Sequence, residues 1–249
     1  MSSRAGARGG ARDPSVMVVT GSWPVDAAEL RSVQEELAIA CPPGWHVPTG
    51  AYVIGGCFAC FSRCSRGPGL TGEPGWAGAT LALGPQVVSG VAVAGVARGV
   101  YEPGLLALRE GPLLEAAVRA LPRMPEVLLV NAAGRDHPRG AGLALQLGAV
   151  LGVPTVGVTH RPLLACGAWP SAERGSRSLL QLGGRTVGCW LRTRTQARPL
   201  AVHPGWRTDL DTACAVILDG IGRVRAPEPL RQTRRMARLA RAGAWVASS

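Results

Sequence analysis

The 249-residue chain contains no lysine, only two phenylalanines and two tyrosines, and no apolar run that approaches the ~18 residues needed to cross a membrane. Because lysine is absent, all 27 basic residues are arginines, and the formal net charge is +11. A guanidinium group binds phosphate through two parallel hydrogen bonds, so this excess of arginine is compatible with a polyanionic partner. A GC-rich genome would produce the same composition, however, and the charge alone does not establish that partner.

The seven cysteines are not the even set that is typical of a secreted, disulfide-stabilised chain. We therefore expect reduced thiols and a cytoplasmic location. Cys57, Cys60 and Cys64 form a C-x2-C-x3-C run for which a zinc site is one interpretation, although a fourth ligand is missing. Residues 52–61 are predicted to be a strand, so Cys57 and Cys60 should point to opposite faces. Buried thiols in the core are the favoured interpretation.

The hydrophobic pattern predicts one domain over residues 16–249, preceded by a disordered basic tail over residues 1–15. The expected elements of its first half are a helix at 24–40, hairpin-linked strands at 52–61, 76–83 and 86–96, and a helix from 104 that Pro122 ends. Those of its second half are a buried strand at 127–130, a helix at 142–151, a parallel strand at 154–158, a loop at 171–178, strands near 186–192 and 199–202, and helices at 210–218 and 229–241. This order predicts an α/β fold in which helices flank a mixed sheet of a three-strand antiparallel meander and parallel strands.

Four motifs occur in the order in which the endonuclease V family has them. Asn131-Ala-Ala-Gly-Arg-Asp-His-Pro-Arg139 follows an apolar strand and resembles the family's Asp-Gly-x-Gly and His-Pro-Arg. Tyr101-Glu-Pro-Gly-Leu-Leu-Ala-Leu-Arg-Glu110 is similar to its Pro-Tyr-x-Pro-Gly-x-Leu-Ala-Phe-Arg-Glu segment. His203-Pro-Gly-Trp-Arg207 and Pro227-Glu-Pro-Leu-Arg231 match its Ser-x-Gly-His-Arg and C-terminal Pro-Glu-Pro-x-Arg. The resemblance extends from about the first predicted helix to the last.

The resemblance implies a ribonuclease H-like fold and hydrolysis of a phosphodiester near a deaminated base, inosine, in DNA or RNA. Such chemistry needs clustered carboxylates that hold Mg²⁺, which activates water and neutralises charge on the phosphate. Magnesium, with manganese as a substitute, is therefore the expected cofactor. The expected partner is a nucleic acid. The protein is expected to be a monomer and to make no contact with a membrane.

Several family roles fall on residues that keep the family's chemistry. The resemblance assigns Glu110 to a metal-binding carboxylate on a helix. It assigns Tyr101 and Pro103 to a turn that wedges beside an extruded base, where aromatic stacking offsets part of the unstacking cost. His137 matches a histidine near the metal and the scissile phosphate, and Arg139 is suited to a backbone phosphate.

Other positions depart from the family pattern at the atoms on which the chemistry depends. Phe58 stands where the first metal-binding aspartate is expected, and it has no oxygen to offer. Asn131 stands at the aspartate of Asp-Gly-x-Gly, where an amide carbonyl brings no negative charge to a metal. His160 replaces the lysine of Gly-Val-Ala-Lys, so a permanent cation becomes a group that is mostly neutral at pH 7.

Two further departures affect the expected base pocket and its surroundings. Ala132 adds a methyl group at the first glycine of Asp-Gly-x-Gly, whereas Gly134 keeps the last and is assigned to substrate binding. Trp206 replaces the histidine of Gly-His-Arg. With two of three family carboxylates missing, Asp136 and Asp211 are the nearest acids that could compensate, and sequence does not place either of them in the site.

Two functions remain open from the residues. The first is a divergent nuclease with rearranged ligands or a softer metal such as Mn²⁺, with cleavage severely reduced or lost. The second is a non-catalytic nucleic-acid-binding protein, which fits the replacements better; a chain without any role is a third. On the last predicted helix, a cationic stripe is either a contact for nucleic acid or a solvated face, and it consists of Arg231, Arg234, Arg235, Arg238 and Arg241.

Overall fold

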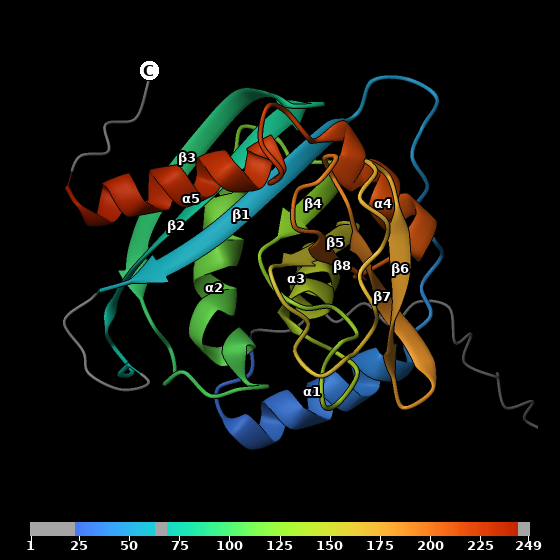
Figure 1. Ribbon diagram of the computed structural model, residues 1–249. Coiled ribbons are helices and arrows are strands. Elements are labelled where there is room, and N and C mark those ends of the chain that lie inside the picture. Colours follow the sequence, from blue (N-terminus) through green and yellow to red (C-terminus); the bar gives the residue numbers. More distant parts are fainter. Residues whose placement is uncertain (1–22, 63–68, 244–249) are drawn as a thin grey trace, which may run out of the picture.

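A computed structural model describes residues 23–62 and 69–243; the predicted tail at 1–15 and Cys64 lie outside the described residues. An eight-stranded mixed sheet runs through the protein in the order β3-β2-β1-β4-β5-β8-β7-β6 (Figure 1). Its strands are β1 Val53–Phe61, β2 Pro74–Leu83, β3 Gln86–Val96, β4 Val127–Val130, β5 Thr155–Thr159, β6 Arg177–Leu182, β7 Arg185–Leu191 and β8 Leu200–Pro204. The strands β1 to β3 form an antiparallel meander, and β1, β4 and β5 run parallel. The predicted ribonuclease H-like α/β sheet is confirmed.

Helices cover both faces of this sheet. They are α1 Ala27–Ile39, α2 Leu106–Arg119, α3 Leu143–Leu151, α4 Leu210–Asp219 and α5 Glu228–Arg241. The apolar side chains of α2 and α3 form one core cluster with one face of the sheet, while α4 packs on the other face in a second cluster. Figure 1 shows α5 crossing β1, β2 and β3 on the face opposite α2. No helix in the described ranges is long and apolar enough to span a membrane.

Side chains of β1 alternate between α2 and α5, and this alternation determines the geometry of the site. Cys57 is buried in the cluster on the α2 side. The Cys60 thiol instead donates a hydrogen bond of 3.4 Å to the carbonyl oxygen of Ala237 in α5. The predicted opposite orientation of the two thiols is confirmed, and no group of three or more potential metal-binding side chains occurs among the residues that the structure describes.

Glycines on β1 and β2 allow α5 to lie unusually close to the sheet. A Cβ atom on Gly56 would come within 2.6 Å of the Pro229 backbone, and one on Gly78 within 2.8 Å of the Thr233 carbonyl oxygen. Both distances are shorter than a side-chain contact allows, so these positions need glycine. The close approach brings the next turn of α5, including Arg234, down onto the strand.

One strand was missed by the sequence analysis. Residues 177–182 form β6, which pairs with β7 at the edge of the sheet, whereas part of this stretch was expected to be a loop. The hairpin turn is Gly183-Gly184, with both residues at positive φ, and such a pair is a recognised hairpin signal. Exposed and less exposed residues alternate along β6, because only one of its faces is covered, but the sequence Arg-Ser-Leu-Leu-Gln-Leu does not itself alternate between polar and apolar residues.

Candidate active site

A cavity of about 210 Å³ lies beside the turn that the sequence assigns to the wedge. Tyr101 on this turn is 51% exposed, and its ring is free to contact a ligand. The residues lining the cavity come from four segments and include Tyr101, Pro103, Asn131, Ala132, His137 and Leu163. The cavity therefore brings together five of the residues that the sequence singled out.

Three side chains hold the turn through one backbone atom, the carbonyl oxygen of Gly104. Gln34 Nε2 and His137 Nε2 each lie 3.1 Å from this oxygen, and a guanidinium nitrogen of Arg139 donates to it at 2.7 Å. Arg139 Nε also donates to Gln34 Oε1 at 2.6 Å. Gly104 has φ +81°, a left-handed conformation that favours glycine. His137 and Arg139 thus position the wedge turn.

Gln34 was not identified from the sequence, although a signal was present. It lies on α1 between Leu30 and Leu37 at helical spacing, and all three side chains are buried. A glutamine in an apolar stripe must find hydrogen-bond partners, because burying an unpaired amide is unfavourable. Its partners are the Gly104 carbonyl oxygen and Arg139.

His137 is neutral at physiological pH. Burial lowers its pKa to about 4, with the positive charge of Arg139 acting in the same direction and the hydrogen bond to Gly104 opposing it. A neutral imidazole can donate one hydrogen bond and accept another. Its Nδ1 atom accepts a hydrogen bond of 3.3 Å from the backbone N–H of Arg139. The proton of the neutral ring is therefore on Nε2, which donates to the Gly104 carbonyl oxygen.

Asp136 is fully buried and serves a structural purpose. Its carboxylate accepts hydrogen bonds from the backbone nitrogens of Leu163, Leu164 and Ala165, at 2.6, 2.9 and 2.8 Å. Three backbone donors use most of the acceptor capacity of a carboxylate. Asp136 therefore holds the segment after β5 and does not replace a missing metal ligand.

Asp211 does not replace one either. It lies in the first turn of α4, where its carboxylate forms an ion pair with Arg177 of β6. Its side chain is 81% exposed. Neither of the two acids considered from the sequence rebuilds a carboxylate cluster.

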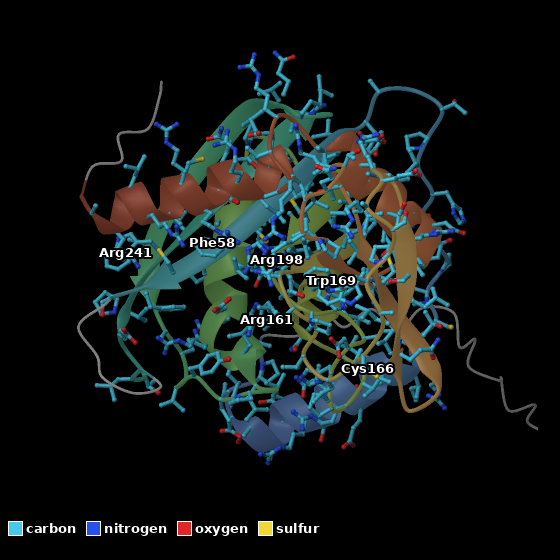
Figure 2. The ribbon with its side chains drawn as sticks, in the orientation of Figure 1. Phe58, Arg161, Cys166, Trp169, Arg198 and Arg241 are labelled. Atoms are coloured by element: carbon cyan, nitrogen blue, oxygen red, sulfur yellow. The ribbon has the colours of Figure 1, made fainter. Side chains whose placement is uncertain are left out.

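An arginine side chain lies between Phe58 and Asn131, the two residues that the resemblance assigns to replaced carboxylates. Phe58 lies on the α5 face of β1, and Asn131 directly follows β4, the parallel neighbour of β1. A guanidinium nitrogen of Arg234 donates to Asn131 Oδ1 at 2.7 Å, and the Arg234 Cζ atom lies 5.2 Å from the centre of the Phe58 ring. The Cζ atom of Arg238 lies 6.0 Å from the same ring (Phe58 is labelled in Figure 2).

Arg234 has no counterion among the described residues. Its Nε atom is buried without a hydrogen-bond partner. Burial lowers the pKa of the guanidinium, and the charge of Arg238 lowers it further. A half-buried cation that is repelled by a neighbouring cation is electrostatically suited to bind an anion.

His160 extends this positive region to the end of β5. Its Nδ1 atom lies 3.0 Å from a guanidinium nitrogen of Arg225. Burial lowers the pKa of His160, and the charges of Arg225 and Arg234 add to the effect. A second, smaller cavity of about 40 Å³ is bordered by Asn131, His160, Arg231 and Arg234.

Glu110, by contrast, lies on the α2 side of β1. Burial raises its pKa to about 7, and the adjacent Arg109 opposes the rise only in part. The same carboxylate helps to raise the pKa of the Cys57 thiol on that face. Within the described ranges, Glu110 makes no hydrogen bond and no ion pair.

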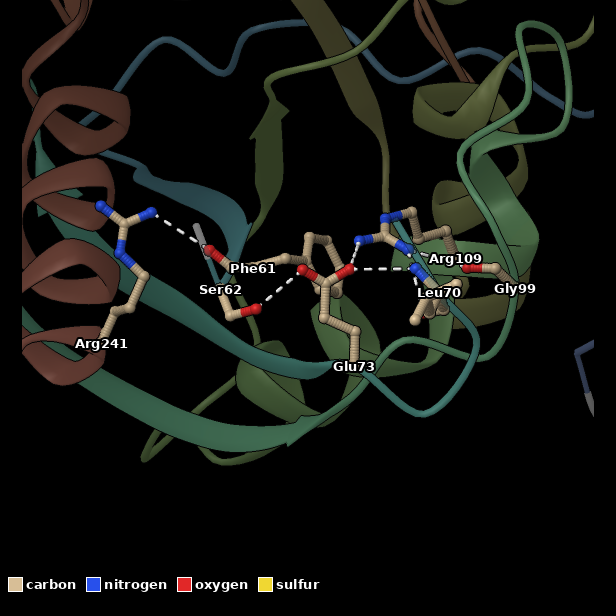
Figure 3. Close-up of polar contacts among 7 residues, drawn as sticks. All are labelled: Phe61, Ser62, Leu70, Glu73, Gly99, Arg109 and Arg241. Carbon is tan, nitrogen blue, oxygen red and sulfur yellow. Dashed lines mark hydrogen bonds and ion pairs between the residues drawn. The ribbon is translucent and has the colours of Figure 1, made fainter. Parts of the chain in front are cut away.

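The arginine that precedes Glu110 anchors α2 to the meander (Figure 3). Arg109 forms an ion pair of 2.6 Å with Glu73, and both side chains are more than 90% buried. Arg109 also donates to the carbonyl oxygen of Gly99 at 2.9 Å, while its Cζ atom lies 4.0 Å from the centre of the Phe61 ring. Ser62 donates to the other oxygen of Glu73 at 2.8 Å. This network fixes the helix position at which Glu110 is presented.

Comparison with known proteins identifies the family. The Endonuclease V family model matches residues 81–235. An endonuclease V from Streptomyces avermitilis is 36% identical over 225 residues, which cover 89% of this chain and 95% of that protein. This chain belongs to the endonuclease V family. A relative from Geotalea uraniireducens is 43% identical over 137 residues, and the match spans 55% of this chain and only 58% of that relative.

Solved endonuclease V structures share the fold. The crystal structure from S. avermitilis superposes with a TM-score of 0.79 at 35% identity, covering 89% of this chain and 96% of that one. A Ciona intestinalis endonuclease V in complex with inosine-containing DNA superposes with a TM-score of 0.71 at 17% identity, covering 87% of this chain and 98% of that one. At that identity, the Ciona structure supports the fold alone.

Three further residues that the motifs single out are Gly134, Ala132 and Trp206. Gly134 is buried behind the cavity wall, where a Cβ atom would collide with the Pro204 carbonyl oxygen. Ala132 is 4% exposed and lines the cavity. Trp206 donates its backbone N–H to Thr155 Oγ1, at the opposite end of β5 from His160, so its indole does not join the site.

The residues present do not fit the divalent metal that the endonuclease V family implies. Mg²⁺ needs hard oxygen ligands that carry negative charge. Phe58 offers no oxygen, the Asn131 carbonyl oxygen already accepts from Arg234, and Glu110 carries a raised pKa on the other face of β1. A guanidinium at this place would repel the metal by Coulomb's law.

Proposed function

We propose that this endonuclease V family member binds nucleic acid and does not cleave it by the metal-dependent route. The observation that carries the proposal is the position of Arg234, whose guanidinium bonds to Asn131 and lies over Phe58. In this position it supplies the positive charge that a metal would supply to a phosphate. Binding is therefore retained, while water activation is lost.

The chemical distinction rests on what a guanidinium can do. It stays protonated, forms charge-assisted hydrogen bonds with phosphate and cannot lower the pKa of a bound water as a metal ion does. Glu110 is half-protonated near neutral pH and has no partner on its face of β1. Two other carboxylates lie near the cavity within the described ranges: Asp136 is bonded to three backbone N–H groups, and Glu102, on the exposed turn beside Tyr101, lies 3.9 Å from Arg31.

The cavity beside Tyr101 supports recognition of a base. Its wall is mostly apolar, and its polar lining residues are Gln34, Glu102, Asn131, His137, Thr159 and Arg161. A base that leaves its stack can lie against such a wall and stack on an aromatic ring. The Ciona relative, which shares this fold, was crystallised with DNA containing an inosine, and inosine is therefore the base to test first.

The decisive experiment measures binding and cleavage on the same substrates. The purified protein is incubated with inosine-containing single- and double-stranded DNA and RNA, with Mg²⁺ and separately with Mn²⁺. We expect no metal-dependent nicking and a binding constant that falls steeply with salt. Arg234→Gln should weaken binding by about tenfold and reduce the salt dependence by about one ion, whereas Arg123→Gln, at an exposed position before β4, should not. Metal-dependent nicking that disappears in Glu110→Ala would falsify the proposal and favour a divergent nuclease.

Restoring the missing ligands tests the role of Arg234 directly. The double variant Phe58→Asp/Asn131→Asp is compared with the triple variant that also carries Arg234→Ala. In the double variant the guanidinium would pair with the new carboxylates, so we expect no Mg²⁺ binding by titration calorimetry. The triple variant should bind Mg²⁺. Equal Mg²⁺ affinity in both variants would show that Arg234 does not exclude the metal.

A further inference from the structure

The segment between β5 and β6 carries three exposed apolar side chains, two of which, Leu164 and Trp169, do not line the cavity of the proposed site. Leu163, Leu164 and Trp169 are 46%, 50% and 53% exposed. The segment begins at the cavity, which Arg161, Pro162 and Leu163 border, and leads away from it. Exposed large apolar side chains grouped on one segment are unusual unless they contact a ligand or partner.

This segment is held rigidly at several points along its length. Asp136 binds its start through three backbone N–H groups. Cys166 pairs with Gln181 of β6 through two backbone hydrogen bonds, of 3.0 and 2.8 Å. The indole nitrogen of Trp190 donates to the Gly167 carbonyl oxygen at 3.1 Å. Trp169 is therefore presented to solvent in a fixed conformation, which lowers the entropic cost of binding to its ring.

A buried arginine joins the Trp169 segment to the segment that carries Arg198. Arg192, which is 7% exposed, donates to the carbonyl oxygens of Pro170 and Ser171, each at 2.8 Å, and to that of Ala197. All three hydrogen bonds of the Arg192 side chain go to backbone carbonyl oxygens. As a result Arg198 lies over the Trp169 ring, with its Cζ atom 5.6 Å from the ring centre (Figure 2).

Three arginines, with the neutral His160 between two of them, connect Trp169 with the candidate active site. Arg225 donates to the carbonyl oxygen of Arg198 at 3.0 Å and lies 3.0 Å from His160 Nδ1. The charge of Arg198 contributes to lowering the pKa of Arg225, after burial. His160 and Arg234 border the same small cavity, and the charge of Arg234 contributes to lowering the pKa of His160. The positive path thus runs from Arg234 to Arg198 and ends at an exposed indole.

We propose that Trp169 and Arg198 form a second contact for single-stranded nucleic acid. A base stacks on the indole of Trp169, and Arg198 and Arg225 bind the phosphates of the strand that leads to Arg234. An aromatic ring at the end of a cationic path is the arrangement by which proteins bind unpaired strands, because every base has a face that can stack. A paired base could not reach the ring, so the contact selects for single strands. This inference rests on the proposal that the protein binds nucleic acid.

Equilibrium binding to fluorescein-labelled single-stranded and duplex oligonucleotides of one sequence tests the contact in the full-length protein. Trp169→Ala should weaken single-strand binding roughly tenfold and leave duplex binding nearly unchanged, and Trp169→Phe should restore most of the loss. Arg198→Ala should reduce the salt dependence of single-strand binding by about one ion. The control is Arg123→Ala, which removes the same charge outside the path. Unlabelled single strand should quench tryptophan fluorescence in the native protein and in Trp45→Phe, and less in Trp169→Phe.

Three results would overturn the contact. If Trp169→Ala and Arg198→Ala bind single strands as tightly as Arg123→Ala does, the segment has another partner, such as a protein, while nucleic-acid binding at Arg234 is unaffected. If Trp169→Ala weakens single-strand and duplex binding equally, no base stacks on the indole. If the native protein binds neither oligonucleotide at low salt, the proposed function and this contact both fail.

Discussion

The two faces of β1 carry opposite arrangements of charge. On the α2 face, Glu73 is paired with Arg109, and Glu110 forms no ion pair within the described ranges, its pKa raised by burial. On the α5 face, Arg234 and Arg238 lie over Phe58, and neither forms an ion pair in the part of the chain that the structure describes. A metal centre would gather carboxylates around one cation, whereas here the strand separates the acid from the cations.

This separation explains how each face remains compatible with a folded chain. A buried charge must be paired, lose its charge or recruit an ion from solution. Arg109 and Glu73 pair, Glu110 takes up a proton near neutral pH, and Arg234 keeps a charge that an external anion can neutralise. The α5 face is therefore the one on which binding and stability depend on a ligand.

Breaking the buried pair on the α2 face should have the largest effect on stability. Arg109→Met leaves Glu73 buried without its cation, and we expect the free energy of unfolding to fall by about 3–5 kcal/mol. The matched control is Arg119→Met, which removes the exposed i,i+4 pair with Glu115 and should cost less than about 0.5 kcal/mol. Urea denaturation measures both variants. Similar losses in the two would mean that burial does not distinguish these pairs.

Acidification should act on the cavity side through His137. Its pKa is lowered to about 4 in the folded protein, so the unfolded chain binds more protons between pH 6.5 and 4. Stability contributed by the neutral imidazole is present above pH 6.5 and is lost as the pH falls, by about 2 kcal/mol at pH 5. Denaturation curves give the free energy of unfolding at pH 7 and at pH 5. The difference between these two values should be about 2 kcal/mol smaller in His137→Gln than in the native protein. An unchanged pH dependence in the variant would contradict the assignment.

Glu110 should give the smaller effect, with the opposite dependence on pH. Because its pKa is raised to about 7, the folded state retains a proton that the unfolded chain releases above its ordinary pKa. Stability therefore falls as the pH rises toward 7 and beyond. Glu110→Gln should be more stable than the native protein at pH 8 by roughly 1 kcal/mol, after allowance for partial exposure, and nearly equal to it at pH 4.5. A destabilised variant at pH 8 would indicate a cation bound to Glu110.

Much of the fold was predictable because its elements have clear periods and clear ends. The meander, the fully apolar β4 and the five helices all appear where the sequence places them. The edge strand β6 was missed, since only one of its faces packs and its pattern resembles that of a polar loop. The positions of Phe58, Asn131 and His160 at one end of the sheet follow from the motif order, but their contacts do not.

The sequence by itself determined the family motifs and the charge, and it predicted the loss of carboxylates at Phe58 and Asn131. It could not distinguish Arg234 from the other arginines of α5, because helical spacing gives them one common stripe. Only the tertiary structure decided that Gly56 and Gly78 bring α5 close enough for Arg234 to reach Asn131. It also decided that Asp136 binds backbone and that Trp169 is exposed at the end of a cationic path. These outcomes depend on distances between segments far apart in the chain, which local sequence patterns do not contain.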